Sequence, residues 1–425
     1  MKSIISSLKG TRDFYPEVMA VRNWLYGTIA QVSASFGYQE YDGPFLESIE
    51  LYAAKSGEEL VKEQSFVFPD RGGDLITLRP ELTPSLTRMI AQRQRQLVFP
   101  LRWWSFGPFW RYERPQKGRT REFFQWNADL MGVNSPAADA ENIALIASFF
   151  QRVGLTPDDV VILVNNRRLM DAQLTAAGIT GEQKPGVLRW IDRRDKLSSN
   201  DWELYGSEIG LSSSQITAMK TTLGNQDLWK QSEDLVGMFA AAQDLGISPY
   251  LRFDPGVVRG LDYYTDTVFE AQEIRGDIRR AILGGGRYDN LVADVGGDPL
   301  PGIGFAMGDV VISLILEAKG LIPANVGVYP AQVLVTVFDQ ERQPASLAFA
   351  TRLRQAGINT NLYPETAKLP KQFKYADRLG IRLAVVIGPD EAAQRLVTVK
   401  NLADSSQQTI SAEQAPILIQ QLLAA

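Results

Sequence analysis

Apolar and polar residues alternate in short periods along the first 160 positions of the chain, with turn-forming residues between the periods. Apolar residues recur at helical spacing over residues 18–36, and an extended stretch follows at 38–44. Two stretches rich in aromatic residues, 101–112 and 124–133, predict buried strands that the charged turn 113–122 connects. Two strands that flank a long Arg-rich loop predict an antiparallel sheet that holds a substrate.

The middle of the chain changes between strand and helix patterns. VVILVNN, at residues 160–166, predicts a further strand, and the polar, helical segment at about 172–245 predicts an insertion. Strand patterns return in three ranges, at 251–253, 267–272 and 279–283. We expect glycine-rich turns after them, and then a helix at about 310–319.

The pattern changes again after a predicted linker at 321–327. Short apolar runs predict strands at 331–338, 358–363, 383–387 and 396–402. Helical patterns occupy residues 344–356, 370–379 and the C-terminal end. This alternation predicts a small, mostly parallel α/β domain. We therefore expect two domains, 1–325 and 326–425, of which the first contains the insertion.

Length and composition are typical of a globular protein with two domains. The chain has 425 residues, of which 45% are hydrophobic and 22% are charged. No apolar run reaches membrane-spanning length and the first residues lack a signal-peptide pattern, so we expect a cytoplasmic protein without a membrane partner. The net charge of −5 argues against general coating of nucleic acid, but it allows a local basic surface that recognises one RNA.

The chain contains no His and no Cys. This absence excludes disulfides, cysteine nucleophiles, histidine-containing catalytic triads and histidine-ligated zinc. Any reaction must therefore use carboxylates, Arg, Lys, Tyr or the substrate itself.

The segment from Arg111 to Arg121, which contains most of the charged turn, carries five cations in eleven positions. A triphosphate needs several fixed cations, and each guanidinium can bind two oxygens at once. The pattern therefore indicates a phosphate-binding loop, and a solvated hairpin tip is the alternative.

A rigid segment further upstream presents Glu81 and Thr83 between two prolines, a pair that suits an α-ammonium group. Gln125 and Asp129 share one face of the strand after the Arg-rich loop, because four residues is an even step along a strand. Together these carboxylates supply what a zwitterionic amino acid requires. Taken alone, the proline segment is equally typical of a turn with a helix cap.

A third region combines glycines with tyrosines, in VRGLDYYT at 258–265 and GGGRYD at 284–289. Consecutive glycines in a strand-like run let a ligand approach the backbone, and tyrosines add flat walls with hydroxyl ends. A β-hairpin with aromatic packing is the other interpretation.

In this order, the segments resemble the histidyl-tRNA synthetase family. The similar segments are KGTRDFYP at 9–16, the first helix with Pro44, RYERPQKGRTREF at 111–123, RGLDYYT with GGGRYD, and KQFKYADRLGIRLAVVIGPDE at 371–391. The second of these is similar to the class II dimer motif, the third to the second class II motif, and the last to an anticodon-binding domain. The resemblance covers nearly the whole chain.

The resemblance implies a class II fold and a two-step reaction. The fold would be an α+β catalytic domain on an antiparallel sheet with a helical insertion, followed by an α/β anticodon-binding domain. The activity would be that of a histidine–tRNA ligase, which uses ATP with Mg²⁺ to form histidyl-adenylate and transfers histidine to the 3′ end of tRNA(His). The protein would be a homodimer.

The resemblance also implies residue roles. The histidine-binding residues would be Glu81, Thr83, Gln125, Asp129, Tyr263, Tyr264 and Tyr288. The ATP-binding residues would be Arg111, Glu113, Arg119 and Phe123, with Arg111 and Arg259 as the catalytic pair. Arg114 and Gln116 would meet the acceptor end of tRNA. Lys371, Lys374 and Arg378 lie at helical spacing and either meet phosphates near the anticodon or form a solvated helix face.

One position departs from the family pattern. Class II enzymes usually carry an arginine at the end of their third motif, where this chain has Val311. Loss of a cation–π partner would cost about 1 kcal/mol, so another cation substitutes or activity is impaired. The alternatives are a catalytically silent paralogue, such as a regulatory subunit of ATP phosphoribosyltransferase, and a histidine or RNA sensor.

Overall fold

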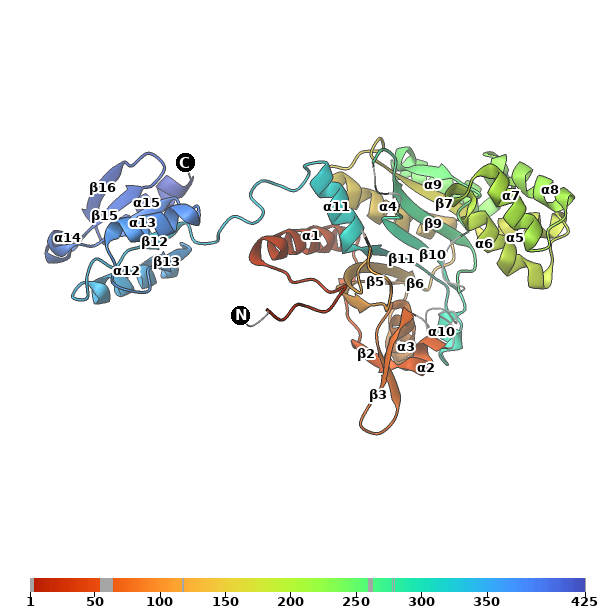
Figure 1. Cartoon of the computed structure of the whole chain (residues 1–425), viewed down its shortest axis with the longest axis horizontal. Coiled ribbons are helices and arrows are strands. Elements are labelled where there is room, and N and C mark those ends of the chain that lie inside the picture. The colour runs from red at the N-terminus through yellow and green to blue at the C-terminus, as the bar shows by residue number, and fades with distance from the viewer. Residues whose placement is uncertain are drawn as a thin grey trace. The chain divides into compact units, whose positions relative to one another are not determined.

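The computed structural model describes residues 4–53, 64–116, 118–258, 263–276, 278 and 280–424. The chain divides into two compact units, Met1–Pro323 and Ala324–Ala425 (Figure 1). Within the described ranges, no helix is long and apolar enough to cross a membrane.

An eight-stranded sheet forms the centre of the first unit, in the order β1-β5-β6-β11-β10-β9-β7-β8. The strands are β1 (Gln39–Glu40), β5 (Leu101–Trp110), β6 (Glu122–Met131), β7 (Val160–Asn166), β8 (Leu251–Phe253), β9 (Thr267–Glu273), β10 (Leu283–Arg287) and β11 (Gly302–Gly308). The pairs β1–β5 and β7–β8 are parallel and the other neighbours are antiparallel. The predicted antiparallel sheet is thus confirmed, with a parallel strand added at each edge.

One face of this sheet is apolar and packs against helices. Trp126 and Leu130 of β6 and Phe305 of β11 are buried in one cluster with residues of three helices. These helices are α1 (Pro16–Ser35), α4 (Pro136–Arg152) and α11 (Asp309–Ala318). The period of two along each strand therefore sends every second side chain into this core.

The opposite face carries polar residues and glycines. Gln125 of β6 is paired with Gly308 of β11, and Asp129 with Gly304. Gly304 is in turn paired with Gly286 of β10. Directly paired residues project to the same side of a sheet, so glycines lie beside the polar side chains along this face.

The strand predicted at 279–283 is wrong in position. Residues 280–282 lie outside any strand, and β10 contains the three glycines, for which the sequence had indicated both glycine-rich turns and a strand-like run. The cause is close packing within the sheet. A Cβ on Gly286 would lie 2.8 Å from the Thr267 carbonyl oxygen, and one on Gly285 would lie 2.6 Å from the Gly304 carbonyl oxygen. These glycines are needed for close approach of strands and not for a turn.

Smaller elements cover one end of the polar face. They are α3 (Thr83–Arg93) and α10 (Leu291–Asp294), whose Leu86 and Leu291 pack in a cluster with Tyr263 and Tyr288. Beside them lies a three-stranded sheet in the order β2-β4-β3. It consists of β2 (Leu46–Ser48), β3 (Phe66–Pro69) and β4 (Leu75–Leu78), with α2 (Ile49–Ala53) after β2.

Helices fill the predicted insertion, and their buried residues belong to the same hydrophobic cluster as the apolar face of the central sheet. They are α5 (Arg167–Ala176), α6 (Lys184–Asp192), α7 (Ser199–Glu208), α8 (Ser213–Gly224) and α9 (Glu233–Asp244). The rings of Trp190 and Trp202 stack with centroids 4.0 Å apart. Each indole N–H donates to the backbone carbonyl of the other tryptophan at 2.7 Å. This reciprocal pair satisfies both buried polar groups and joins α6 to α7.

The second unit contains a five-stranded sheet in the order β13-β12-β14-β15-β16. Its strands are β12 (Val333–Val335), β13 (Thr360–Leu362), β14 (Leu383–Val386), β15 (Leu396–Asn401) and β16 (Gln407–Ser411). Its helices are α12 (Gln343–Gln355), α13 (Leu369–Arg378), α14 (Pro389–Gln394) and α15 (Ala415–Ala424). The sheet is mixed and not mostly parallel, because β14–β15 and β15–β16 are antiparallel. The short connection between β14 and β15 does not allow a parallel crossover.

A buried ion pair joins the central sheet to α4. Arg287, which is 1% exposed, donates to the Asp139 carboxylate and, at 3.0 Å, to the Val133 carbonyl oxygen. Burial raises the pKa of Asp139, and the Arg287 charge opposes that rise. The carboxylate therefore depends on its cation to stay ionised inside the protein.

We expect Arg287→Met to lower the free energy of unfolding by about 3–5 kcal/mol, because it leaves the Asp139 charge buried without its partner. Urea denaturation of the full chain measures the change. The double variant Arg287→Met/Asp139→Leu should recover most of the loss. A single variant as stable as the parent would contradict the importance of this pair.

Candidate functional site

The N-terminal motif, at residues 9–16, links the start of β6 to the start of α11 through hydrogen bonds. Arg12 donates to Asp309 at 2.8 Å, and the other Asp309 oxygen accepts from the backbone N–H of Phe124 at 2.9 Å. The Gly10 carbonyl accepts from the backbone N–H of Arg121 at 2.8 Å. Burial raises the pKa of Asp309, and the cation of Arg12 lowers it. The first motif thus fixes the two elements that border the site.

The Arg-rich segment is a hairpin loop between β5 and β6. Gln116 and Arg119 pair at its tip through backbone hydrogen bonds of 3.0 and 2.8 Å. Gly118 supplies the left-handed conformation of the turn, with φ of +77°. Arg114 and Gln116, predicted to meet tRNA, are exposed on this loop and do not line the cavity below it.

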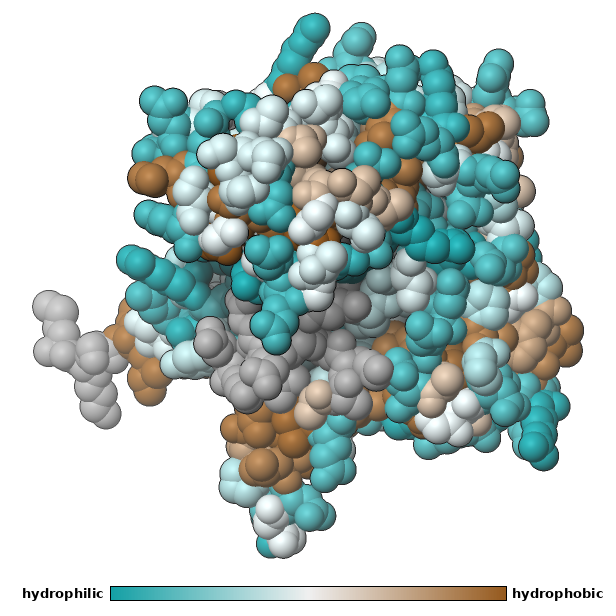
Figure 2. All heavy atoms as spheres, turned by 90° about the vertical axis from the view of Figure 1, so that its right-hand side faces the viewer, coloured by the Kyte–Doolittle hydropathy of each residue, from teal (hydrophilic) through white to brown (hydrophobic). Residues whose placement is uncertain are grey.

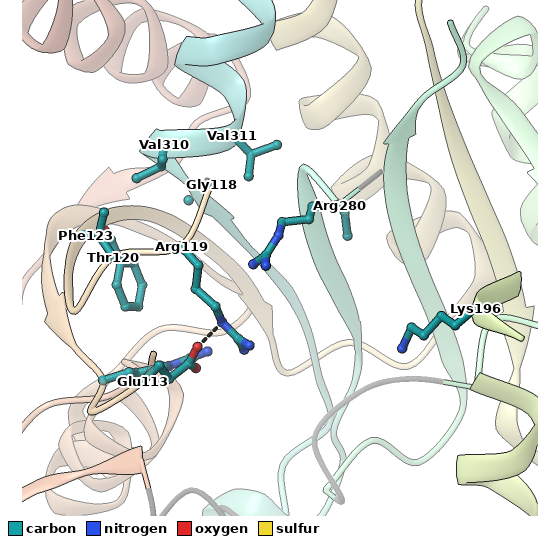
Figure 3. A pocket seen from close by; sticks show the side chains of 12 residues that line it. Glu113, Gly118, Arg119, Thr120, Phe123, Lys196, Arg280, Val310 and Val311 are labelled. Carbon is teal, nitrogen blue, oxygen red and sulfur yellow. Dashed lines mark ion pairs between the residues drawn. The ribbon is translucent and has the colours of Figure 1, made fainter. Parts of the chain in front are cut away.

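A cavity of about 520 Å³ lies between this loop, β11 and the β9–β10 connection (Figure 3). The four residues predicted to bind ATP all line it: Arg111, Glu113, Arg119 and Phe123. Its remaining walls include Lys196 of the insertion, Arg280 and Val311. The volume is in the usual range for a small-molecule site.

Cations and an aromatic ring shape this cavity. Arg119 forms an ion pair with Glu113. The Nε of Arg111 donates to the Pro80 carbonyl at 3.0 Å, and its guanidinium lies 5.4 Å from the centroid of the Phe123 ring. Burial lowers the pKa of Arg111, while the nearby Glu81 carboxylate raises it. The arrangement suits a planar base beside anionic groups.

Glu81 is the centre of a second, buried cluster. It is 4% exposed and accepts a hydrogen bond of 3.0 Å from the Tyr263 hydroxyl, to which Thr83 also bonds. The ring of Tyr263 meets those of Tyr264 and Tyr288 edge-on, at centroid distances of 5.1 and 5.9 Å. The predicted histidine-binding residues Glu81 and Thr83, at the start of α3, and those of the tyrosine segments therefore come together.

Asp129 is buried on the polar face of the sheet and has one hydroxyl donor, Tyr288. Burial raises the pKa of Asp129 to about 7, and the hydrogen bond from Tyr288 lowers it. A Cβ on Gly304 would overlap the Asp129 carboxylate, so the glycine makes room for it. Nearby, Oε1 of Gln125 has no hydrogen-bond partner among the described residues. Two polar groups on one face are thus oriented without being fully satisfied by the protein.

The tyrosines differ in their surroundings. Tyr288 is only 2% exposed and supports Asp129 from within the protein. Tyr264 is half-buried and lines a separate cavity of about 440 Å³, together with Thr265 and the cations Arg167 and Lys184.

The predicted catalytic residue Arg259 lies outside the described residues.

The structure adds site residues that the sequence did not indicate. Arg79 is fully buried and donates to Asp42 at 2.5 Å and to the Pro108 carbonyl at 2.9 Å, which holds the segment that presents Glu81. Arg280 and Lys196 line the cation-rich cavity. The neighbouring basic residues at 279–280 were visible in the sequence, but the predicted strand there gave them no role.

Comparison with known proteins agrees with this geometry. The family model described as histidyl-tRNA synthetase matches residues 10–309, and the model for an anticodon binding domain matches residues 332–422. The histidine–tRNA ligase of Opitutus terrae is 37% identical, over 97% of both chains. The chloroplastic/mitochondrial histidine–tRNA ligase of Arabidopsis thaliana is 38% identical, over 94% of this chain and 83% of the relative.

A solved structure extends the similarity to three dimensions. The crystal structure of histidyl-tRNA synthetase from Nostoc sp. PCC 7120 aligns with a TM-score of 0.80 and 27% identity. The alignment covers 99% of this chain and all of that one. With a family match over most of its length and close relatives over nearly all of it, the chain belongs to the histidyl-tRNA synthetase family.

Proposed function

We propose that this protein is a class II histidine–tRNA ligase, which activates histidine with ATP and transfers it to the 3′ end of tRNA(His). The observation that carries the proposal is the arrangement of two sites around one sheet. A cation-rich cavity with an aromatic wall adjoins a buried carboxylate cluster, and Arg111 lies close to both. ATP suits the first site, and an amino acid with a basic ring suits the second.

Histidine would be recognised at both of its ends. Glu81, Thr83 and Gln125 hold the α-ammonium group, and Asp129 and Tyr264 address the ring nitrogens. Tyr263 and Tyr288 complete the pocket, the latter by orienting Asp129. Two ring nitrogens in one fixed geometry are a property of histidine alone among the natural side chains, so a buried carboxylate beside one of them gives selectivity.

Activation requires no base from the enzyme. The histidine carboxylate is already ionised at neutral pH, attacks the α-phosphorus of ATP, and displaces pyrophosphate. Arg111 and Arg259 neutralise charge at the α-phosphate. Glu113 binds the adenine side of ATP, and Arg119 binds the distal phosphates. Phe123 stacks on the base. The rate enhancement therefore comes from positioning and electrostatic stabilisation.

Magnesium would enter with the nucleotide. Phosphate oxygens are the kind of hard ligand that Mg²⁺ prefers, so ATP would bring ligands of its own. Bound with ATP, Mg²⁺ would neutralise phosphate charge that the arginines leave uncompensated.

Transfer and tRNA binding use more exposed residues. A hydroxyl of the terminal ribose of tRNA attacks the carbonyl carbon of the adenylate, the bond from this carbon to the phosphate oxygen breaks, and AMP leaves, with a phosphate oxygen as the proton acceptor. Arg114 and Gln116, on the hairpin loop, face the acceptor end. Lys371, Lys374 and Arg378 are exposed on α13, whose Gln372 and Ala376 are buried, so the three cations lie on the free side of the helix and meet phosphates near the anticodon.

Catalysis and anticodon binding are assigned to separate domains. Residues 1–325, with the insertion at about 172–245, form the catalytic domain, and 326–425 form the anticodon-binding domain. The protein works in the cytoplasm.

The alternative is a regulatory subunit or sensor that retains the fold without chemistry. Val311 is the observation that favours it. Against it stand the anticodon-binding match over 332–422, the complete set of predicted ATP-binding residues around one cavity, and the names of the relatives.

Histidine-dependent exchange of labelled pyrophosphate into ATP tests the function directly. The parent protein should catalyse it, and a regulatory subunit or sensor should not. Arg111→Ala should lower kcat/KM for the exchange about 10²–10³-fold, because transition-state charge at the α-phosphate loses a donor. Arg114→Ala is the matched control on the same loop, and it should impair only the charging of tRNA. Absence of exchange by the parent protein would refute the proposal.

The raised pKa of Asp129 predicts a pH dependence. Its carboxylate is largely protonated below about pH 7 in the empty site and ionised above it. We therefore expect the KM for histidine to fall as pH rises from about 7 to 8, a range in which the free imidazole is already mostly neutral. Asp129→Asn should raise that KM and remove this part of the pH dependence, while the KM for ATP changes little. Equal effects on both substrates would exclude a role in ring recognition.

The homodimer is proposed from an exposed apolar surface. Val67, Phe68 and Leu75, on the hairpin of β3 and β4, are 38%, 41% and 52% exposed, and Figure 2 shows apolar side chains gathered on the protruding end of the molecule. Light scattering should give twice the chain mass of 47.2 kDa. Phe68→Asp/Leu75→Asp should give the monomer mass. Retention of the dimer mass by the double variant would place the interface elsewhere.

A further inference from the structure

Arg280 occupies an unusual position in the nucleotide cavity. It belongs to the connection between β9 and β10, and its half-buried side chain extends into the cavity (Figure 3). Among the described residues, no carboxylate pairs with it. A guanidinium that is partly removed from water without a counter-charge is unfavourable, unless a ligand provides one.

The other cations of the cavity already interact with carboxylates of the protein. Arg119 pairs with Glu113. Lys196 pairs with Asp192 at 2.7 Å, and Arg111 lies in the field of Glu81. Arg280 is therefore the cation that, within the described part of the cavity, has its charge available for an anionic ligand.

The side chains of Arg280 and Val311 both lie close to Gly118. A Cβ built on Gly118 would lie 3.3 Å from Cδ of Arg280 and 3.7 Å from Cγ2 of Val311, so these two side chains border the same space below the hairpin tip. Gly118 leaves this space open, and its positive φ disfavours any other residue. Val311 is short and apolar, and it leaves room for the longer side chain.

We propose that Arg280 binds a phosphate group of ATP and supplies from the β9–β10 connection the positive charge that the chain lacks at residue 311. This inference rests on the proposed ligase function and names a binding residue for it. The ligand is a nucleoside triphosphate, whose phosphate oxygens match the planar donors of a guanidinium.

Exchange kinetics of the full-length protein test the assignment. Arg280→Ala should raise the KM for ATP ~10- to 100-fold, since one charge-assisted contact is lost, and leave the KM for histidine within about twofold. Arg280→Lys should retain part of the affinity. Arg275→Ala is the matched control, because Arg275 is exposed on the same connection and does not line the cavity. An unchanged KM for ATP, or an equal rise for both substrates, would overturn the assignment.

A second variant separates charge from local structure. Val311→Arg should restore most of the ATP affinity to Arg280→Ala, because it returns a cation to the space that both side chains border. A merely structural role for Arg280 predicts no such rescue, and absence of rescue would count against the assignment.

Calorimetric titration with Mg-ATP distinguishes this inference from the proposed function, because it needs no turnover. A parent protein that binds ATP without exchanging pyrophosphate would refute the ligase function. In that case, weaker ATP binding by Arg280→Ala would still support the phosphate contact, and unchanged binding would refute it.

Discussion

The central sheet must pack into the hydrophobic core with its apolar face and line the substrate site with its polar face. Along β6, Trp126 and Leu130 enter the core while Gln125 and Asp129 face the opposite side. The neighbouring strands repeat this alternation in register, so small residues such as Gly304 lie next to the polar side chains. Any slip of one residue would exchange the two faces and destroy both. The strand register therefore determines the polar face as strictly as it determines the core on the other side of the sheet.

Ion pairs between segments far apart in the chain hold the elements around the sheet in place. Arg12 fixes Asp309 at the start of α11, and Arg287 fixes Asp139 on α4. Buried charges of this kind are costly when alone and orienting when paired. The site is thus arranged before any ligand binds, which lowers the reorganisation needed in the reaction.

This organisation explains how a chain without histidine can belong to a family that handles histidine. The substrate carboxylate is the nucleophile and needs no imidazole to activate it. What the protein must supply is a set of fixed cations for phosphate and buried carboxylates for the amino acid. Arg111 and Glu81 show that both kinds of group can lie close together when burial and opposite charge act jointly on them.

Local patterns predicted the strand that carries Gln125 and Asp129, the Arg-rich loop and the helical insertion, because periodicity and turn chemistry depend on neighbouring residues. The motifs were specific enough to indicate the family. Contacts between distant segments decided the rest. The pattern allowed the glycines of β10 to lie in turns or in a strand-like run, and close contacts with Thr267 and Gly304 on the adjoining strands decide for the strand. Arg280 had no apparent role until folding brought its connection against Gly118, because the space that a side chain enters is formed by residues far away in the sequence.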